Sequence, residues 1–256
     1  RKRGDRIVMA NTLLLTGTID PNVFNTNKDD KPINVYLTDA RERLNQYNAA
    51  IERYIKESSF DSIVFAENSG AKFDFQRFEL LAEQYGKKFE YILRVLSEGQ
   101  ISKMQQKGKS YGEADLIDFA FRNSQLLSQA SQVYKATGRA FLTNSKRVIS
   151  DVPNQFIAKN KIGWVNTEFF KVDKNDYFTY LATGIDLMDD YKSQNIERVW
   201  YKLIKESGGL QVKAFKAFPR LHGVIGSAIN KNYDKSKTQY FVCDLLCAIG
   251  YFNIRY

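Results

Sequence analysis

Two groups of cations beside glycines are the residues best suited to chemistry in this chain. The first is Lys107–Glu113 (KGKSYGE), which places two lysines and two glycines ahead of an expected helix. Backbone N–H groups and the helix dipole favour negative charge at such a position, so the segment could form an oxyanion cradle. It does not match the phosphate-loop pattern GxxxxGK[ST], and a solvated loop is the alternative interpretation.

The second group is Lys135–Arg139 (KATGR), in which a lysine and an arginine flank a glycine inside an otherwise apolar strand. An unpaired charge is costly to bury, so each cation needs an anionic partner. A structural ion pair and a bound phosphate explain the pattern about equally well. Together with Lys107 and Lys109, however, four cations lie near glycines, and this combination favours a diphosphate ligand.

Two further segments follow apolar strands and could bind the rest of a ligand. In Thr16-Gly17-Thr18 a glycine permits close approach to the backbone, and the hydroxyls can form hydrogen bonds. In Glu67–Gly70 (ENSG) an acid and an amide could contact a ribose or a base edge. A plain strand-to-loop turn and a helix N-cap are the respective alternatives.

Acidic residues gather later in the chain, at Asp186, Asp189, Asp190 and Glu197. They could bind a metal or act as a general base, although acids are also common near helix N-termini because of the dipole. The single histidine, His222, lies in a loop with glycines and an arginine. It could contact a phosphate or a sugar, or it could be an ordinary surface histidine.

The elements that must position these residues alternate between strand and helix. The apolar runs Thr12–Ile19, Ser62–Ala66 and Phe89–Val95 predict strands, and the segments Asp39–Lys56 and Phe75–Tyr85 predict helices between them. This alternation indicates a right-handed, mainly parallel α/β sheet. In open sheets of this kind ligands bind outside the carboxyl ends of the strands, where the candidate segments fall.

Composition sets broad limits on the protein. Its 256 residues include 38 Lys and Arg against 29 Asp and Glu, a net charge of +9, and 14% are aromatic, which argues against a mostly disordered chain. Residues 1–8 contribute three of those charges, and we interpret them as an added or disordered extension before Met9. Residues 9–256 then form one domain, with a nucleotide-binding half at 9–150 and a more variable half at 151–256.

The C-terminal segment bears on location. Cys243 and Cys247 are spaced wrongly for a disulfide and too sparsely for a zinc site, which predicts free thiols in a reducing compartment. No apolar run approaches the ~20 residues of a membrane span, so we expect a cytoplasmic protein. The apolar stretch Tyr240–Ile249 predicts a helix packed on the core. Because Lys231, Lys235 and Lys237 precede it, peripheral contact with an anionic membrane is a second hypothesis.

The succession LLLTGTIDP, IVFAENSG, KGKSYGEADLIDFAF, YKATGRAFLTN and PRLHGVIGS resembles bacterial glycosyltransferases of capsule, lipopolysaccharide and O-antigen loci, of GT-A-like type. The resemblance implies a Rossmann-type, mainly parallel central sheet flanked by helices, followed by a variable acceptor half. It also implies transfer of a sugar from a nucleotide-sugar donor to a growing surface glycan or lipid-linked oligosaccharide, with no nucleic acid as partner. A nucleic-acid-binding or nucleotide-binding protein without glycosyl transfer is the alternative.

The resemblance assigns roles to the candidate residues. Acids near the acceptor, and hence catalytic, would be Asp186, Asp189 and Asp190. Residues that bind the donor would be Thr16, Gly17, Thr18, Glu67, Asn68, Lys107, Lys109, Tyr111, Lys135, Thr137, Gly138, Arg139, Asn144, His222, Gly226 and Ser227.

One departure from the family concerns metal binding. GT-A enzymes usually carry an Asp-x-Asp motif after a central strand, whereas this chain has Thr143-Asn144-Ser145 at the equivalent place. Either another acid binds Mn²⁺ or Mg²⁺, or no metal is needed. Lysine and arginine can stabilise a leaving diphosphate, which favours metal-independent or weakly metal-dependent chemistry.

Overall fold

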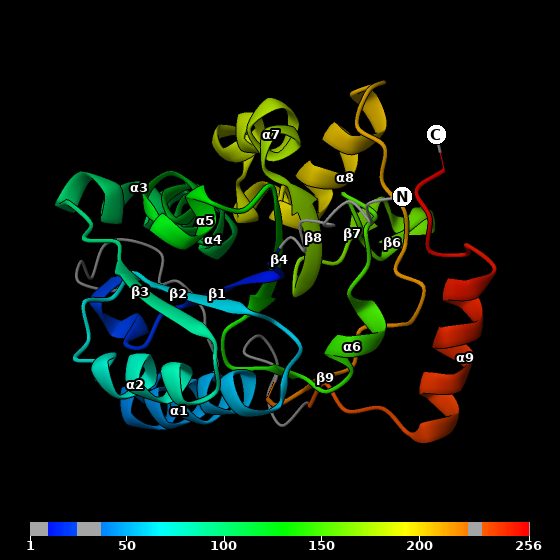
Figure 1. Ribbon diagram of the computed structural model, residues 1–256. Helices are drawn as coiled ribbons and strands as arrows, with labels where there is room; N and C mark the ends of the chain where they lie inside the picture. The colour runs from blue at the N-terminus through cyan, green and yellow to red at the C-terminus, as the bar shows by residue number, and fades with distance from the viewer. Residues whose placement is uncertain (1–9, 25–36, 225–231, 256) are drawn as a thin grey trace, which may run out of the picture.

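A five-stranded sheet forms the centre of the protein (Figure 1). The computed structural model describes residues 10–24, 37–224 and 232–255, so the predicted extension lies outside the described residues. The strand order is β3-β2-β1-β4-β8; the first four strands are parallel, and β8 runs antiparallel to β4. The prediction of a mainly parallel α/β sheet is confirmed. The strands are β1 (Thr12–Gly17), β2 (Ser62–Glu67), β3 (Lys88–Leu93), β4 (Gln132–Thr137) and β8 (Phe169–Asp173).

Helices α1 (Ala40–Glu57) and α2 (Gln76–Gln84) cover one face of the sheet, the lower face in Figure 1. The side chain of Asp39 caps α1 by accepting a 2.8 Å hydrogen bond from the backbone N–H of Glu42. The predicted apolar stripe of α1 is buried, with Tyr47, Ile51 and Tyr54 packed in one core cluster with β1 and β2. Both predicted helices are therefore present at close to the expected bounds.

The opposite face is covered by α3 (Glu98–Lys107), α4 (Lys109–Asn123) and α5 (Gln125–Ser128). The sequence predicts a loop over Lys107–Glu113, and this prediction is wrong. Gly108, at φ +94°, is the single joint between two consecutive helices, a conformation that glycine adopts without strain. The buried apolar face of α4, which packs on the sheet, extends the helix back to Lys109.

The second half of the chain packs beside β4 and β8 as short elements. Residues 211–218 form no strand and make only an isolated bridge between Lys213 and Gln155. The helix α8 begins at Ile196, where the Asn195 side chain caps it. Besides η1 (Pro21–Phe24), which follows β1, the remaining elements are β5 (Phe141–Leu142), α6 (Ser145–Val148), β6 (Ala158–Lys159), η2 (Asn160–Ile162), β7 (Trp164–Val165), α7 (Lys174–Asp176), η3 (Tyr177–Leu181), η4 (Ala182–Leu187), η5 (Asp190–Lys192), α8 (Ile196–Glu206), β9 (Leu221–His222) and α9 (Lys237–Ala248).

The C-terminal helix α9 lies along the flank of the molecule (Figure 1). A helix here is as predicted, but the expectation that it packs into the core is wrong, because Cys247 is the only buried residue between Lys237 and Ala248. Cys243 and Cys247 are free thiols, as expected. Within the described part of the chain, no helix has the length and apolar character that crossing a membrane requires.

Candidate active site

A cavity of about 180 Å³ lies at the carboxyl ends of β1 and β4. The connection from β1 leads to β2 on one side and β4 pairs on the other, so this is the point where strand order reverses, the usual ligand position in open α/β sheets. The cavity brings together seven residues that the sequence predicts as ligand-binding. They are Thr16, Gly17, Thr18, Asn68, Lys109, Thr137 and Arg139.

Arg139 is the most distinctive residue of this cavity. Its side chain is only 8% exposed, and Nη1 donates a 2.8 Å hydrogen bond to Oε1 of Gln46. Nε is buried and has no hydrogen-bond partner among the described residues, and no carboxylate there forms an ion pair with the guanidinium. A buried donor without a partner costs about 1–3 kcal/mol, and more when it is charged. The cavity wall therefore holds a positive charge with which no described carboxylate forms an ion pair.

A second buried guanidinium, that of Arg43, reinforces this positive charge. Nε and Nη2 of Arg43 both donate to the backbone carbonyl of Thr18, and Nη1 donates to that of Leu37 at 3.1 Å. Burial lowers the pKa of Arg43, and the nearby charge of Arg139 lowers it further. Arg43 is not among the predicted site residues, although its position four residues before Tyr47 puts it on the apolar side of α1.

Gly17, which lines the cavity, and Gly138, which lies next to its lining residues Thr137 and Arg139, have no room for a side chain. A Cβ on Gly138 would lie 2.8 Å from the carbonyl oxygen of Thr16 and 3.0 Å from the ring of Tyr47. A Cβ on Gly17 would lie 2.7 Å from the rings of Phe65 and Tyr47. Both positions therefore require glycine for packing between β1, β4 and α1, whatever the ligand.

At the end of β2 and in the loop after it, Glu67 has a structural role, whereas Asn68 is open to a ligand in the cavity. Glu67 is fully buried, and its carboxylate accepts hydrogen bonds from the backbone N–H groups of Ile19 (2.9 Å) and Gly70 (3.0 Å) and from Ser69. These hydrogen bonds join the loop after β1 to the loop after β2, and Glu67 does not line the cavity. Asn68 does line the cavity, where its Oδ1 accepts a 2.7 Å hydrogen bond from Oγ1 of Thr18.

Of the two alternatives for Lys135, a structural ion pair and a bound phosphate, the structure shows the ion pair. Its side chain is fully buried; Nζ forms an ion pair with Glu113 and donates a 2.9 Å hydrogen bond to the carbonyl of Thr167. The expected contact with a diphosphate is therefore replaced by a protein carboxylate. Glu113 itself lines the cavity. Behind it, burial raises the pKa of Glu197, and the negative charge of Glu113 raises it further.

The predicted catalytic acids Asp186 and Asp189 form ion pairs outside the cavity. Asp186 is exposed and pairs with Lys103 at 2.9 Å, while its backbone carbonyl accepts from Nζ of Lys107. Asp189 caps η5 and pairs with Lys192 at 2.9 Å. Neither lines the cavity. Lys107 thus also lies outside it, on the last turn of α3.

Asp190 fills the helix N-terminus that the sequence predicts as an oxyanion cradle. Its Oδ2 accepts a 3.0 Å hydrogen bond from the backbone N–H of Ser110, and a Cβ on Gly108 would lie 2.5 Å from the same oxygen. The carboxylate of Asp190 therefore takes the place expected for a phosphate. Tyr111 is buried beneath the ammonium groups of Lys103 and Lys107, and of this segment's predicted residues only Lys109 reaches the cavity.

The described part of the late His-Gly loop, residues 219–224, does not line the cavity. Asn144 holds this loop to β5 by accepting from the N–H of Arg220 and donating to the carbonyl of Phe218, both at 2.9 Å. His222 is half exposed, and its Nδ1 lies 2.7 Å from Oδ1 of Asp234. The predicted residues Gly226 and Ser227 lie outside the described residues.

A second cavity, of about 400 Å³, is lined by Phe169 of β8 and by residues of β9 and α9. Its lining includes Glu168 and Tyr233. The N–H of Thr137, which lines the first cavity, donates a 2.9 Å hydrogen bond to the carbonyl of Glu168. Burial raises the pKa of Tyr233, and the charge of Glu168 raises it further. The hydrogen bond to Glu168 thus joins the lining of the first cavity to the lining of the second.

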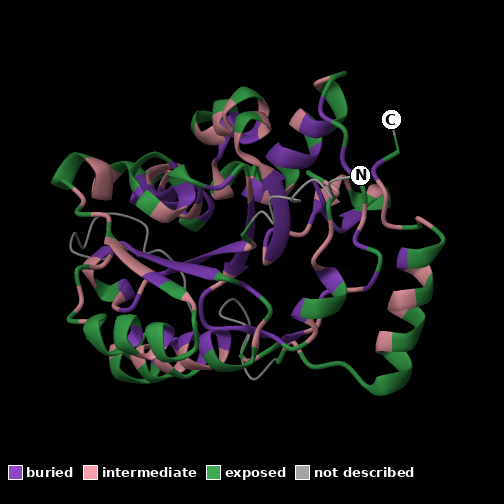
Figure 2. Cartoon of the chain, in the orientation of Figure 1, coloured by how far each residue is buried: buried purple, intermediate pink, exposed green. Residues whose placement is uncertain are grey.

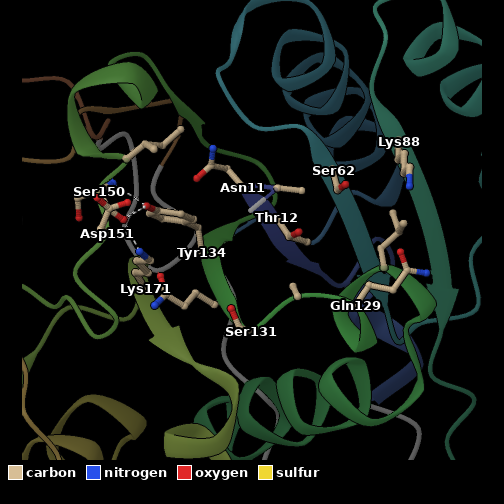
Figure 3. Close-up of a pocket in the computed structure, with 15 residues that line it drawn as sticks. Asn11, Thr12, Ser62, Lys88, Gln129, Ser131, Tyr134, Ser150, Asp151 and Lys171 are labelled. Atoms are coloured by element: carbon tan, nitrogen blue, oxygen red, sulfur yellow. Dashed lines mark hydrogen bonds between the residues drawn. The ribbon is translucent and has the colours of Figure 1, made fainter. Parts of the chain in front are cut away.

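A third cavity, of about 830 Å³, lies at the amino ends of the parallel strands, on the opposite edge of the sheet (Figure 3). Lys171, Tyr134 and Ser150 form one wall of it. Nζ of Lys171 donates to the backbone carbonyl of Ser150 and lies 5.1 Å from the centre of the Tyr134 ring. Burial lowers the pKa of Lys171 to about 8.

The donor set of the first cavity does not fit a metal ion. Among the described residues, no three His, Cys, Asp or Glu side chains are grouped so that they could hold one. Glu113, the carboxylate that lines the cavity, is already paired with Lys135. We therefore derive no step through a metal.

No family model matches the chain, and no curated protein matches it. Among solved structures, a nucleotide-diphospho-sugar transferase from Desulfovibrio desulfuricans is 11% identical, with a TM-score of 0.43 over 80% of this chain and 78% of that one. A protein described as a glucose-1-phosphate thymidylyltransferase from Bacillus anthracis is 12% identical, with a TM-score of 0.41 over 94% and 95%. A nucleoside-diphosphate-sugar pyrophosphorylase from Vibrio cholerae is 12% identical, with a TM-score of 0.41 over 77% and 88%. All three TM-scores lie below 0.5, a level at which no function carries over to this chain.

Proposed function

We propose that the protein is a glycosyltransferase that moves a sugar from a nucleotide-sugar donor to a growing bacterial surface glycan or lipid-linked oligosaccharide. The observation that carries this proposal is Arg139, a buried guanidinium with an unpartnered Nε at the point where strand order reverses. A donor diphosphate supplies the negative charge that no described carboxylate provides to this guanidinium. The order of sequence motifs supplies the sugar-transfer part of the proposal.

In this proposal the first cavity binds the donor. Arg139 and Lys109 contact the diphosphate, while Thr18 and Asn68 face the nucleoside. As the glycosidic bond to the diphosphate breaks, negative charge develops on the leaving oxygen. A fixed guanidinium in a water-poor wall stabilises that charge without reorganising, which is the task that a metal performs in related chemistry. Activity is then expected to persist in EDTA.

The second cavity binds the acceptor. Trp164 and Tyr240 supply aromatic faces for a sugar ring, and the backbone carbonyl of Glu168 is hydrogen-bonded to Thr137 of the donor cavity. The carboxylate of Glu168 takes the proton from the attacking acceptor hydroxyl, whose oxygen forms the new bond to the sugar. A positioned general base contributes about 10²–10⁴-fold, so Glu168→Gln should lower kcat by that factor and leave donor affinity nearly unchanged. Loss of donor affinity in place of kcat would contradict this role.

The test of the function is a binding and turnover screen. Calorimetry with UDP, GDP, CMP and TDP sugars and their free nucleotides should identify at least one ligand, and acceptor addition should release the free nucleotide. If no nucleotide binds, the proposal is wrong. A second arm supplies nucleoside triphosphate with sugar 1-phosphate, and formation of pyrophosphate there would indicate a nucleotidyltransferase instead. A salt-dependent gel shift with RNA or DNA would favour the nucleic-acid alternative.

A further inference from the structure

Helix α9 presents its apolar side to solvent. The exposed fractions are 69% for Phe241, 48% for Val242, 53% for Leu245 and 68% for Ile249, which directly follows the helix. Figure 2 shows α9 as mostly exposed or half-buried along its length. These positions recur at three- and four-residue spacing, so they share one face of the helix. A surface helix normally turns such a stripe towards the core. Among the described residues nothing covers the stripe on α9, so it is free to bind an apolar partner.

The side of α9 that faces the protein carries the buried Cys247 and two polar side chains that are bonded to the rest of the protein. Asp244, the only acid of the helix, forms ion pairs with Arg147 (3.1 Å) and Arg220 (2.7 Å) and accepts a 2.8 Å hydrogen bond from the N–H of Phe218. The hydroxyl of Tyr240 donates to the carbonyl of Leu221. These bonds fix the rotation of α9, so its apolar face cannot turn inward without breaking them.

The charges around this face are positive. Lys237 lies four residues before Phe241 on the same side of the helix, and Lys235 precedes it; both lysines are exposed. The exposed side of α9 contains no acid, and the nearby Asp234 is bonded to His222. The net charge of +9 opposes self-association and attracts an anionic surface.

We propose that α9 docks the protein on the surface of an anionic lipid bilayer, with Phe241, Leu245 and Ile249 in the interfacial region and Lys235 and Lys237 among the headgroups. An apolar helical face bordered by lysines is the pattern that binds such interfaces. The docking stands independently of the proposed function. One consequence rests on that function: the inner side of α9, through Tyr240 and Cys243, lines the acceptor cavity, so docking brings that cavity to lipid-linked acceptors.

Co-sedimentation with vesicles tests the proposal. Wild-type protein should bind vesicles of phosphatidylcholine with phosphatidylglycerol about tenfold or more tightly than vesicles of phosphatidylcholine alone, since each lysine near an anionic surface contributes about 1 kcal/mol. The double variant Phe241→Ser with Leu245→Ser should lose that binding. Leu80→Ser with Val95→Ser removes two apolar side chains that are equally exposed elsewhere and should retain it.

Two further measurements make the result decisive. The charge variant Lys235→Glu with Lys237→Glu keeps the apolar face and should lose the preference for anionic vesicles. Sedimentation velocity should show monomers throughout; a dimer that the Phe241→Ser, Leu245→Ser variant abolishes would assign the face to a second copy and overturn the proposal. Equal binding to both vesicle types would overturn it as well. Calorimetric nucleotide binding should be unchanged in all variants, which separates this result from failure of the proposed function.

Discussion

A buried cation lies at each end of the parallel strands, Lys171 at the amino ends and Arg139 at the carboxyl ends. The two side chains differ in how their buried charge can be neutralised. At the amino ends of the strands, Lys171 is hydrogen-bonded to the carbonyl of Ser150, and burial lowers its pKa to about 8, so it becomes neutral only above that pH. At the carboxyl edge, Arg139 cannot lose its proton, and its Nε has no partner among the described residues. A buried lysine can become neutral, whereas a buried arginine needs an anion. The comparison therefore points to the carboxyl edge as the ligand site.

The largest expected effect comes from replacing each of the two cations separately and comparing nucleotide binding. Arg139→Met should weaken nucleoside diphosphate binding by about 100-fold, because charge-assisted hydrogen bonds contribute about 1.5–3 kcal/mol each. Lys171→Met should leave that affinity unchanged. Isothermal calorimetry on both variants decides the matter, and an equal loss in the two variants would refute the distinction between the edges.

The second prediction concerns stability. Burial of the Lys171 ammonium destabilises the folded state, and each unit by which its pKa is lowered corresponds to about 1.36 kcal/mol. Lys171→Met removes this charge and should therefore raise the free energy of unfolding at pH 7 by about 1–2 kcal/mol. The carbonyl of Ser150 keeps its 3.3 Å hydrogen bond from the hydroxyl of Tyr134, so no acceptor is left unpaired. Urea unfolding at pH 7 measures the change.

The sign of the pH dependence follows from the same pKa. Because the folded pKa of Lys171 lies below that of the unfolded chain, the unfolded state binds more protons between about pH 8 and 10. Wild-type stability therefore gains from Lys171 as pH rises through this window, and the advantage of Lys171→Met should shrink by pH 10. An advantage that stays constant from pH 7 to pH 10 would show that charge is not its cause.

The smallest effect is expected at the acids outside the cavity. Asp186 is 78% exposed and its partner Lys103 is exposed as well, and such surface pairs contribute about 0–1 kcal/mol. Asp186→Asn should therefore change kcat by less than about twofold. Steady-state kinetics checks this, and a loss of tenfold or more would restore Asp186 to the reaction.

The sequence predicts the sheet and the meeting of its strand ends because both depend on local periodicity. Once the alternation of strands and helices is read, Thr16–Thr18 and Thr137–Arg139 must lie at one edge if their strands are neighbours. Ion pairs between distant segments follow no such rule. Nothing near Lys135 in the chain indicates that its partner is Glu113, 22 residues earlier, and nothing near Asp190 indicates that it caps a helix 80 residues earlier.

Arg43 was missed for a related reason. On a helix an arginine usually extends to the surface, and only the position of Thr18, 25 residues earlier, shows that its guanidinium is held inside. The sequence could have indicated it through one signal, a charged residue in line with Tyr47 and Ile51.

The unpartnered Nε of Arg139 also has a consequence for heat resistance. A ligand that satisfies a buried charge in the folded chain and has no affinity for the unfolded chain shifts the folding equilibrium by about 2.7 kcal/mol at one hundred times its dissociation constant. For a chain of 256 residues this corresponds to a rise in Tm of about 5–10 °C. The melting temperature is thus a direct reporter of which nucleotide fits, and thermal scanning can rank donors before any acceptor is known.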